Sequence, residues 1–143
     1  MKSNNKIDRL AELADMRQRD LAQALARAVR KQDDHCGKIE ELKRYRHDYA
    51  VPLSDGSLNG ANAQQIVAFI TNLDSLIRNL ETQRPALTAA VQDAEREWLA
   101  SQHKAKSFNK LAQKALLKKQ QILESRQERS LDDAWLAQNF SKT

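Results

Sequence analysis

The side chains best suited to catalysis or metal binding are three histidines and one cysteine. His35, His47 and His103 lack the spacing, to one another or to carboxylates, that metal ligands on one element usually show. Cys36 has no second cysteine for a disulfide or a Cys-x-x-Cys pair, and no glycine-rich loop suited to phosphate binding occurs. These observations predict no catalytic site, metal, cofactor or small-molecule substrate, so the chain is expected not to be an enzyme. His35 lies in an apolar column, which favours a buried histidine bonded to a neighbour over a metal ligand.

The composition favours long helices over a globular core. Of the 143 residues, 5% are aromatic and 30% are charged, which leaves little material for a wide apolar interior. The chain has three glycines and two prolines, and Pro52, Gly56 and Gly60 follow one another closely. This clustering predicts one strong turn between two long elements.

The sequence contains no apolar run near the length of a membrane-spanning helix, and residues 1–5 lack the apolar core of a signal peptide. The protein is therefore expected in the cytoplasm. Its net charge of +5 suggests a partner with an acidic surface.

A first helix is expected at about residues 3–50 and a loop at residues 51–61. Apolar residues recur every seven positions in this helix, with a companion column four positions on, as in a coiled coil. The loop contains Pro52, Gly56 and Gly60, which suit a turn. The two columns comprise Ile7, Ala14, Leu21, Ala28, His35, Leu42 and Tyr49, and then Ala11, Leu25 and Ile39.

A second helix is expected at about residues 62–129. Asn62 and Gln65 have the spacing of a capping box at its start. Pro85 removes one backbone donor and predicts a bend at about residues 83–85, while the apolar register continues across it. The main column comprises Ile66, Leu73, Leu80, Leu87, Ala94, Ser101, Phe108, Ala115 and Ile122, and the companion column Ile70, Ile77, Val91, Trp98, Ala105 and Ala112.

Together these patterns predict an all-α fold, a long two-helix antiparallel coiled-coil hairpin that forms a single domain over residues 1–143. Residues whose numbers sum to about 115 should face each other, and the second helix should extend beyond the end of the first. A capping signal at Ser130 and Asp133 marks a short C-terminal segment at residues 130–143. This segment is either a short helix ordered on a partner or a frayed end.

Near the turn, each helix carries a third apolar column, which a two-stranded seam does not need. It contributes Tyr45 from the first helix and Phe69 and Leu76 from the second, and these should form an exposed apolar patch. Farther from the turn, the column of the first helix holds Lys38, Lys31 and Arg17 instead. The alternative is a wider seam, or one covered by the loop. The predicted patch, with its neighbours, comprises Leu42, Tyr45, Tyr49, Phe69, Leu73, Leu76 and Leu80.

A lysine-rich run lies farther along the second helix. Between Trp98 and Leu123 there are six lysines and no acidic residue. Four of them recur every fourth position and so form a stripe, which suggests either an acidic partner or a solvated helix face. The lysines predicted to contact a partner are Lys104, Lys106, Lys110, Lys114 and Lys118.

The whole chain resembles the FliJ family, small coiled-coil components of the bacterial type III flagellar export apparatus. The likeness is carried by Leu42-Lys-Arg-Tyr45-Arg-His-Asp-Tyr49, the short glycine loop, the stretch from Phe69 through Leu73 and Leu76 to Leu80, and Trp98 ahead of the lysine-rich helix. The resemblance implies a hairpin similar to the central stalk of rotary ATPases.

It also implies that the termini enter the pore of the hexameric export ATPase FliI and that the region near the turn contacts the export gate protein FlhA. By residue match, the gate contact falls on the apolar patch, and the lysines would face the ATPase or another acidic surface. Export chaperones are implied as further partners, without residues assigned to them. The expected location is the cytoplasm, peripherally at the inner face of the cell membrane.

Two alternatives stay open at this point. The first is the equivalent stalk protein of a virulence type III secretion system, with the same architecture. The second is a basic coiled-coil protein that binds nucleic acid, although the lysine run has no interleaved aromatic residue beyond Phe108 and lies in no known binding fold.

Overall fold

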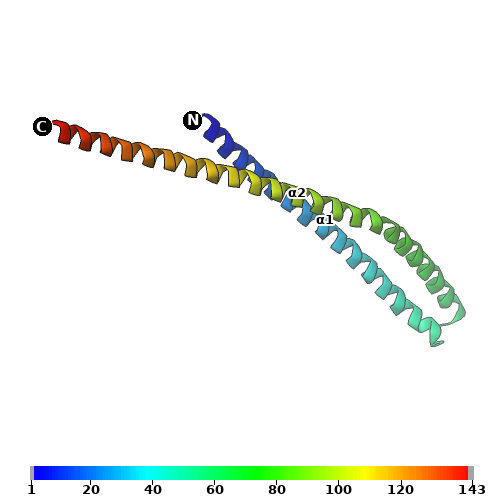
Figure 1. Cartoon of the computed structure of the whole chain (residues 1–143). Coiled ribbons are helices and arrows are strands. Elements are labelled where there is room, and N and C mark those ends of the chain that lie inside the picture. The colour runs from blue at the N-terminus through cyan, green and yellow to red at the C-terminus, as the bar shows by residue number, and fades with distance from the viewer. Residues whose placement is uncertain (1, 142–143) are drawn as a thin grey trace. The chain divides into compact units, whose positions relative to one another are not determined.

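The chain folds into two helices that run antiparallel and pack against each other (Figure 1). A computed structural model describes the backbone of residues 2–141 and the side chains of residues 6–140. Helix α1 comprises Lys2–Ser54 and α2 comprises Gly60–Ser141, and no strand occurs in this described part. The predicted all-α helical hairpin is confirmed.

The contacts divide the chain into two compact units. Unit 1 comprises Met1–Arg19 and Leu99–Thr143, and unit 2 comprises Asp20–Trp98. Each unit holds a segment of α1 against a segment of α2, so each has its own seam.

The seam of unit 2 is built from the predicted apolar columns. Ile39 is fully buried, and Leu21, His35, Leu73 and Ile77 are nearly so. Removing an aliphatic side chain of this size from water stabilises a fold by about 1.5–3 kcal/mol, so these few residues supply much of the packing free energy.

The seam of unit 1 is made of smaller side chains. Ala11 from α1 and Ser101 and Ala105 from α2 are its buried members. Small residues allow two helix backbones to approach closely. A hydrogen bond also crosses this seam: the Asn109 side-chain amide donates to the Asp15 carboxylate over 3.1 Å.

Helix α1 runs past its predicted end near residue 50 and includes Pro52. A proline in the last turn removes one donor but leaves the rest of the helix intact. A free carbonyl of the last turn is satisfied locally: the Asp55 N–H and the Ser54 hydroxyl both donate to the Val51 carbonyl, over 3.2 and 2.9 Å. Gly56 follows with φ of 71°, the left-handed conformation that commonly ends a helix.

Helix α2 begins earlier than predicted, and its cap is Asn59 instead of Asn62. The Asn59 side-chain oxygen accepts from the Asn62 N–H over 2.9 Å, and its backbone carbonyl accepts from the Ala63 N–H over 2.9 Å. This is the geometry of an N-cap residue three positions before its donor. Gly60 is the first residue of α2, and an added Cβ there would meet no heavy atom within 4 Å, so the position does not require glycine.

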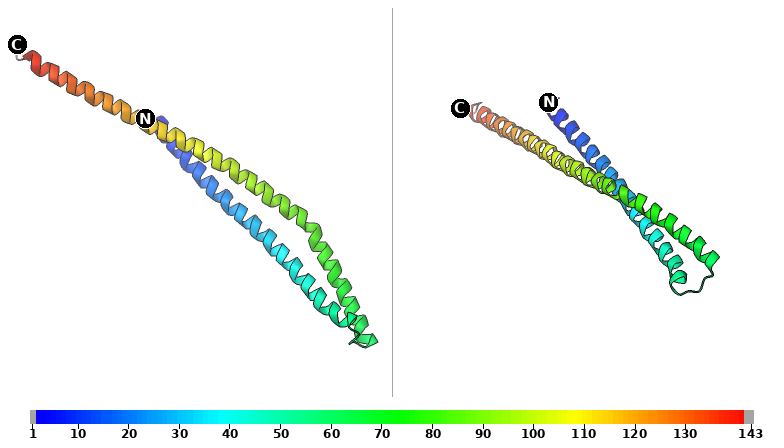
Figure 2. Two further views of the ribbon diagram at one scale, coloured as in Figure 1. Left: turned by 60° about the horizontal axis from the view of Figure 1, so that its bottom comes forward. Right: turned by 90° about the vertical axis from the view of Figure 1, so that its right-hand side faces the viewer.

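Helix α2 continues without interruption through Pro85. Figure 2 shows it bending in its green part, the part that holds this proline. The bend is the one predicted, since proline lacks the N–H that would bond to the carbonyl four residues earlier and its ring crowds that carbonyl.

The predicted break near residue 130 is absent, and the helix runs on to Ser141. No glycine or proline occurs between Pro85 and that point, so nothing in the sequence forces an end at Ser130. All side chains of residues 120–140 are exposed. The predicted extension of the second helix beyond the packed seam of unit 1 is therefore present.

Candidate partner-binding surfaces

An aromatic pair lies next to the turn in unit 2. The rings of Tyr49 on α1 and Phe69 on α2 meet edge to face, with centroids 4.8 Å apart and planes at 65°. Each residue is 43% exposed. Edge-to-face contact is a favoured geometry for aromatic rings, so the pair joins the two helices while leaving apolar surface open to solvent.

Other exposed apolar side chains near the turn include Tyr45 at 47% and Leu76 at 45%. The Tyr45 hydroxyl donates to the Glu41 carboxylate over 3.1 Å. This hydrogen bond, with the nearby negative charge, raises the pKa of the Tyr45 phenol. We call Tyr45, Tyr49, Phe69 and Leu76 the turn patch.

The other members of the predicted patch lie deeper. Leu73 is buried in the seam, and Leu42 and Leu80 are half-buried. Leu73 and Leu80 belong to the main column, whose side chains point toward the partner helix. The surface available to another protein is therefore the turn patch, with these three leucines beneath or beside it.

Two ion pairs link α1 to α2 near the turn patch. The Arg46 guanidinium donates to both carboxylate oxygens of Asp74, over 2.5 and 3.4 Å. This pairing raises the pKa of Arg46. The Lys43 ammonium lies 3.2 Å from the Glu81 carboxylate. Both pairs are partly exposed, so each contributes little free energy to the packing of the two helices.

Five lysines of α2 in unit 1 are exposed, and we call this set the lysine stripe: Lys104, Lys106, Lys110, Lys114 and Lys118. None of the five forms an ion pair with an acidic side chain in the part of the chain that the structure describes. Four of them lie four residues apart, a spacing at which like charges on a helix mildly repel. The positive charge of this surface is therefore not compensated by the described residues.

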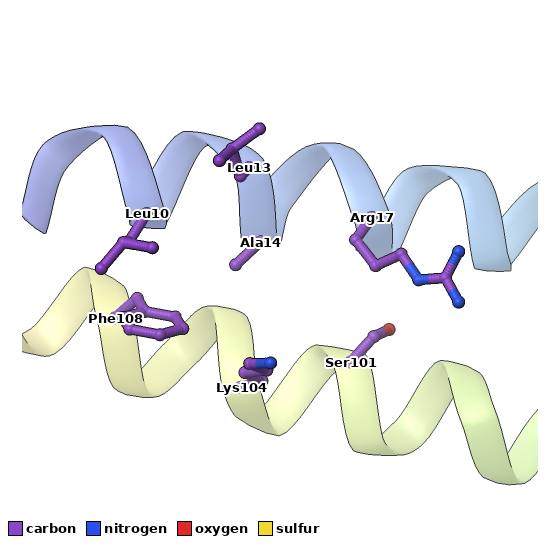
Figure 3. A pocket seen from close by; sticks show the side chains of 7 residues that line it. All are labelled: Leu10, Leu13, Ala14, Arg17, Ser101, Lys104 and Phe108. Atoms are coloured by element: carbon purple, nitrogen blue, oxygen red, sulfur yellow. The ribbon is translucent and has the colours of Figure 1, made fainter. Parts of the chain in front are cut away.

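A pocket of about 190 Å³ lies beside the lysine stripe in unit 1. Leu10 and Phe108 face each other across it, with Lys104, Ser101 and Arg17 further along (Figure 3). The pocket combines an apolar lining with two cations, so it suits an apolar side chain flanked by a carboxylate. The heptad pattern alone does not reveal this pocket, although Leu10 and Arg17 belong to the third column of α1.

The histidines and the cysteine do not come together. His47 and His103 are exposed, and Cys36 is half-buried without a thiol partner. His35 is buried in the seam, where its Nε2 lies 2.6 Å from the Leu80 carbonyl oxygen. The carbonyl can only accept, so this nitrogen carries the proton, and the predicted hydrogen-bonded histidine is confirmed. Among the described residues, no three histidine, cysteine or carboxylate side chains are grouped to hold a metal ion.

Within the described residues, neither helix has a stretch of the length and apolarity needed to cross a lipid bilayer. The turn patch and the lysine stripe are candidate surfaces of two chemical kinds, one aromatic and apolar, the other cationic.

These features define a coiled-coil hairpin protein with an exposed aromatic patch and an exposed cationic surface. The particular family is identified by comparison: the family model described as "Flagellar FliJ protein" matches residues 3–142, and the chain belongs to this family. Comparisons with curated proteins and with solved structures gave no match. The chain is therefore a component of the flagellar protein export apparatus, and its family is a non-catalytic one.

Proposed function

We propose that the protein couples two parts of the flagellar export apparatus, without catalysing a reaction itself. The lysine stripe binds the hexameric export ATPase FliI, and the turn patch binds the export gate protein FlhA. The observation that carries this proposal is the uncompensated charge of the lysine stripe in a chain that belongs to the FliJ family. Five exposed cations without described acidic partners favour an acidic surface on another molecule.

The turn patch supports the second contact. Aromatic side chains have few rotatable bonds, so an exposed aromatic pair already held edge to face loses little conformational entropy on binding. Such residues commonly contribute a large share of the binding free energy at protein interfaces. The buried seam residues Ile39, Leu73 and Ile77 hold the supporting helices together, and the ion pairs Arg46–Asp74 and Lys43–Glu81 also link them.

Contact with the gate places the protein peripherally at the inner face of the cell membrane, on the cytoplasmic side. Export chaperones are further proposed partners. No residue of this chain is assigned to them.

The ATPase contact is tested by reversing Lys106, Lys110, Lys114 and Lys118 to Glu and measuring stimulation of purified FliI. We expect stimulation to be lost while the helical circular dichroism signal is retained, because the substituted side chains are exposed. The matched control reverses four exposed arginines of unit 2, Arg44, Arg78, Arg84 and Arg96. Its overall charge change is the same, and stimulation should survive. Full stimulation by the lysine variant would contradict the proposed contact.

The gate contact is tested with the double variant Tyr45→Ala, Phe69→Ala and the cytoplasmic part of FlhA. Truncating two exposed anchors should weaken binding by about tenfold or more without lowering helicity. The control Val29→Ala, Val67→Ala also truncates two exposed apolar side chains of unit 2, outside the turn patch. Equal affinities of the two variants for FlhA would show that the turn patch is not the contact.

A further inference from the structure

A second cationic surface lies in unit 2, and its residues belong neither to the lysine stripe nor to the turn patch. It is a groove of about 520 Å³ between α1 and α2, which we call the basic groove. Its α1 wall carries Arg27, Arg30, Lys31 and Lys38, with the single carboxylate of Asp34 among them. All five side chains are exposed.

The cations of the basic groove have no described counter-charge. None of the four forms an ion pair within the part of the chain that the structure describes. The α2 wall adds only uncharged residues, among them Gln83 and Ala86. Four cations therefore face solvent against one carboxylate, and an acidic ligand would be attracted to this wall.

The floor of the basic groove is apolar. Leu80 and Leu87 line it from α2, and both are half-buried. A site lined only by cations would suit any polyanion, but an apolar floor favours a ligand that has an apolar face as well. The groove residues include no exposed aromatic ring on which a nucleic acid base could stack.

Two hydrogen bonds across the seam lie at the basic groove. His35 donates to the Leu80 carbonyl over 2.6 Å, and the Gln32 side-chain amide donates to the Thr88 hydroxyl over 3.1 Å. They join α1 and α2 around the proline of α2, where the helix bends (Figure 2). The groove walls are therefore held in place before a ligand arrives, which lowers the conformational cost of binding.

We propose that the basic groove binds an acidic amphipathic helix of a partner protein. The apolar face of that helix lies on Leu80 and Leu87, and its carboxylates pair with Arg27, Lys31 and Lys38. These cations lie on one face of α1, and the rise of a helix places the outer two about 17 Å apart, the length of about three turns. A helix laid into a groove is a common mode of peptide recognition.

The test uses a fluorescein-labelled synthetic helix of fourteen residues, with leucines at spacings of three and four and glutamates on the flanking positions. Fluorescence anisotropy measures its affinity for the full chain. We expect binding that weakens as salt rises, and a loss of about tenfold or more in the variant Arg27→Glu, Lys31→Glu, Lys38→Glu. Ala86→Glu on the opposite wall should also weaken binding, since Ala86 is exposed and glutamate is well tolerated in a helix.

The matched control reverses three exposed cations of unit 1, Arg9, Arg126 and Arg129, and should retain peptide affinity. Circular dichroism verifies that each variant is folded. The proposal is overturned if this control loses as much affinity as the groove variant, or if a peptide with lysine in place of glutamate binds equally well.

Two other occupants are distinguished in the same experiment. Displacement of the peptide by single-stranded RNA at equal charge concentration would assign the groove to nucleic acid. Sedimentation showing self-association that the groove variant abolishes would assign it to a second copy of the chain. Either result overturns the proposal. Neither bears on the ATPase contact, which is measured with the lysine stripe variant.

Discussion

The ring contact between Tyr49 and Phe69 allows a direct test of how the turn patch is held. We expect the variants Tyr49→Ala and Phe69→Ala each to destabilise unit 2, and the double variant to be less destabilised than the sum of the two. The reason is that either truncation alone already removes the edge-to-face contact, so the second truncation lowers the free energy of unfolding by less than it does in the wild-type chain.

The magnitude follows from the exposure and geometry of the rings. Truncating a fully buried phenylalanine costs about 3–5 kcal/mol, and Phe69 is 43% exposed, so Phe69→Ala should cost roughly half of that. The ring contact itself contributes about 0.5–1.5 kcal/mol beyond area burial. Because both rings are partly solvated, we expect a coupling free energy near the lower end of this range.

The assay is urea unfolding followed by circular dichroism at 222 nm for the four proteins of the cycle. A parallel cycle on Tyr45 and Phe69 serves as the control, because no ring contact joins this pair in the described structure. We expect coupling in the first cycle and additivity in the second. Additive free energies for Tyr49 and Phe69 would show that the rings do not hold each other in solution.

Three further predictions concern the seam and the turn. Ile39→Ala removes the one large side chain that is fully buried in the described structure and should cost about 2–4 kcal/mol in urea unfolding, whereas Val67→Ala at an exposed position should cost under about 0.5 kcal/mol. Asn59→Ala removes the N-cap of α2 and should cost about 1 kcal/mol, while Asn62→Ala should cost less because its side chain is not the cap. Hydrogen bonding by Ser57, from its hydroxyl and its backbone N–H, lowers the pKa of the Asp55 carboxyl. The charged form therefore stabilises the turn above the unfolded pKa, and this contribution is lost as the pH falls through the folded pKa. An NMR titration of Asp55 should show the lowered pKa moving up in Ser57→Ala.

The heptad columns were sufficient to predict the helical hairpin, because a single turn signal left only one way to bury two continuous apolar stripes. They also placed His35 opposite Leu80, whose residue numbers sum to the predicted value of about 115, and these two residues are hydrogen-bonded. Periodicity depends on many residues at once, so it survives local irregularities such as Pro85.

The ends of the helices were harder to predict, because they depend on single residues with similar propensities. Asn59 and Asn62 are equally good N-cap residues. Asn59 is the cap because the helix already includes Gly60. Pro52 was interpreted as part of the loop, but a proline near the end of a helix costs only one hydrogen bond. At Ser130 the capping signal was present, but no glycine or proline lies near it to end the preceding helix.

The candidate surfaces were predictable to the extent that they follow from column position. Exposure of Tyr45, Phe69 and Leu76 follows from their place in a third column, while Leu73 is buried because it belongs to the main one. The basic groove was missed, although Lys31 and Lys38 of that same third column signalled it. The missing information was tertiary: only the structure shows which residues of α2 form the opposite wall.

The long exposed part of α2 has a consequence for how the chain behaves alone. Residues 120–140 keep their helical form with every side chain open to solvent. Such a stretch is maintained by local propensity and backbone bonds, which open readily in water. Its amide protons should exchange before those of the seams, and proteases should cut there first. A receptor that encloses it would supply the packing that the rest of the molecule does not provide.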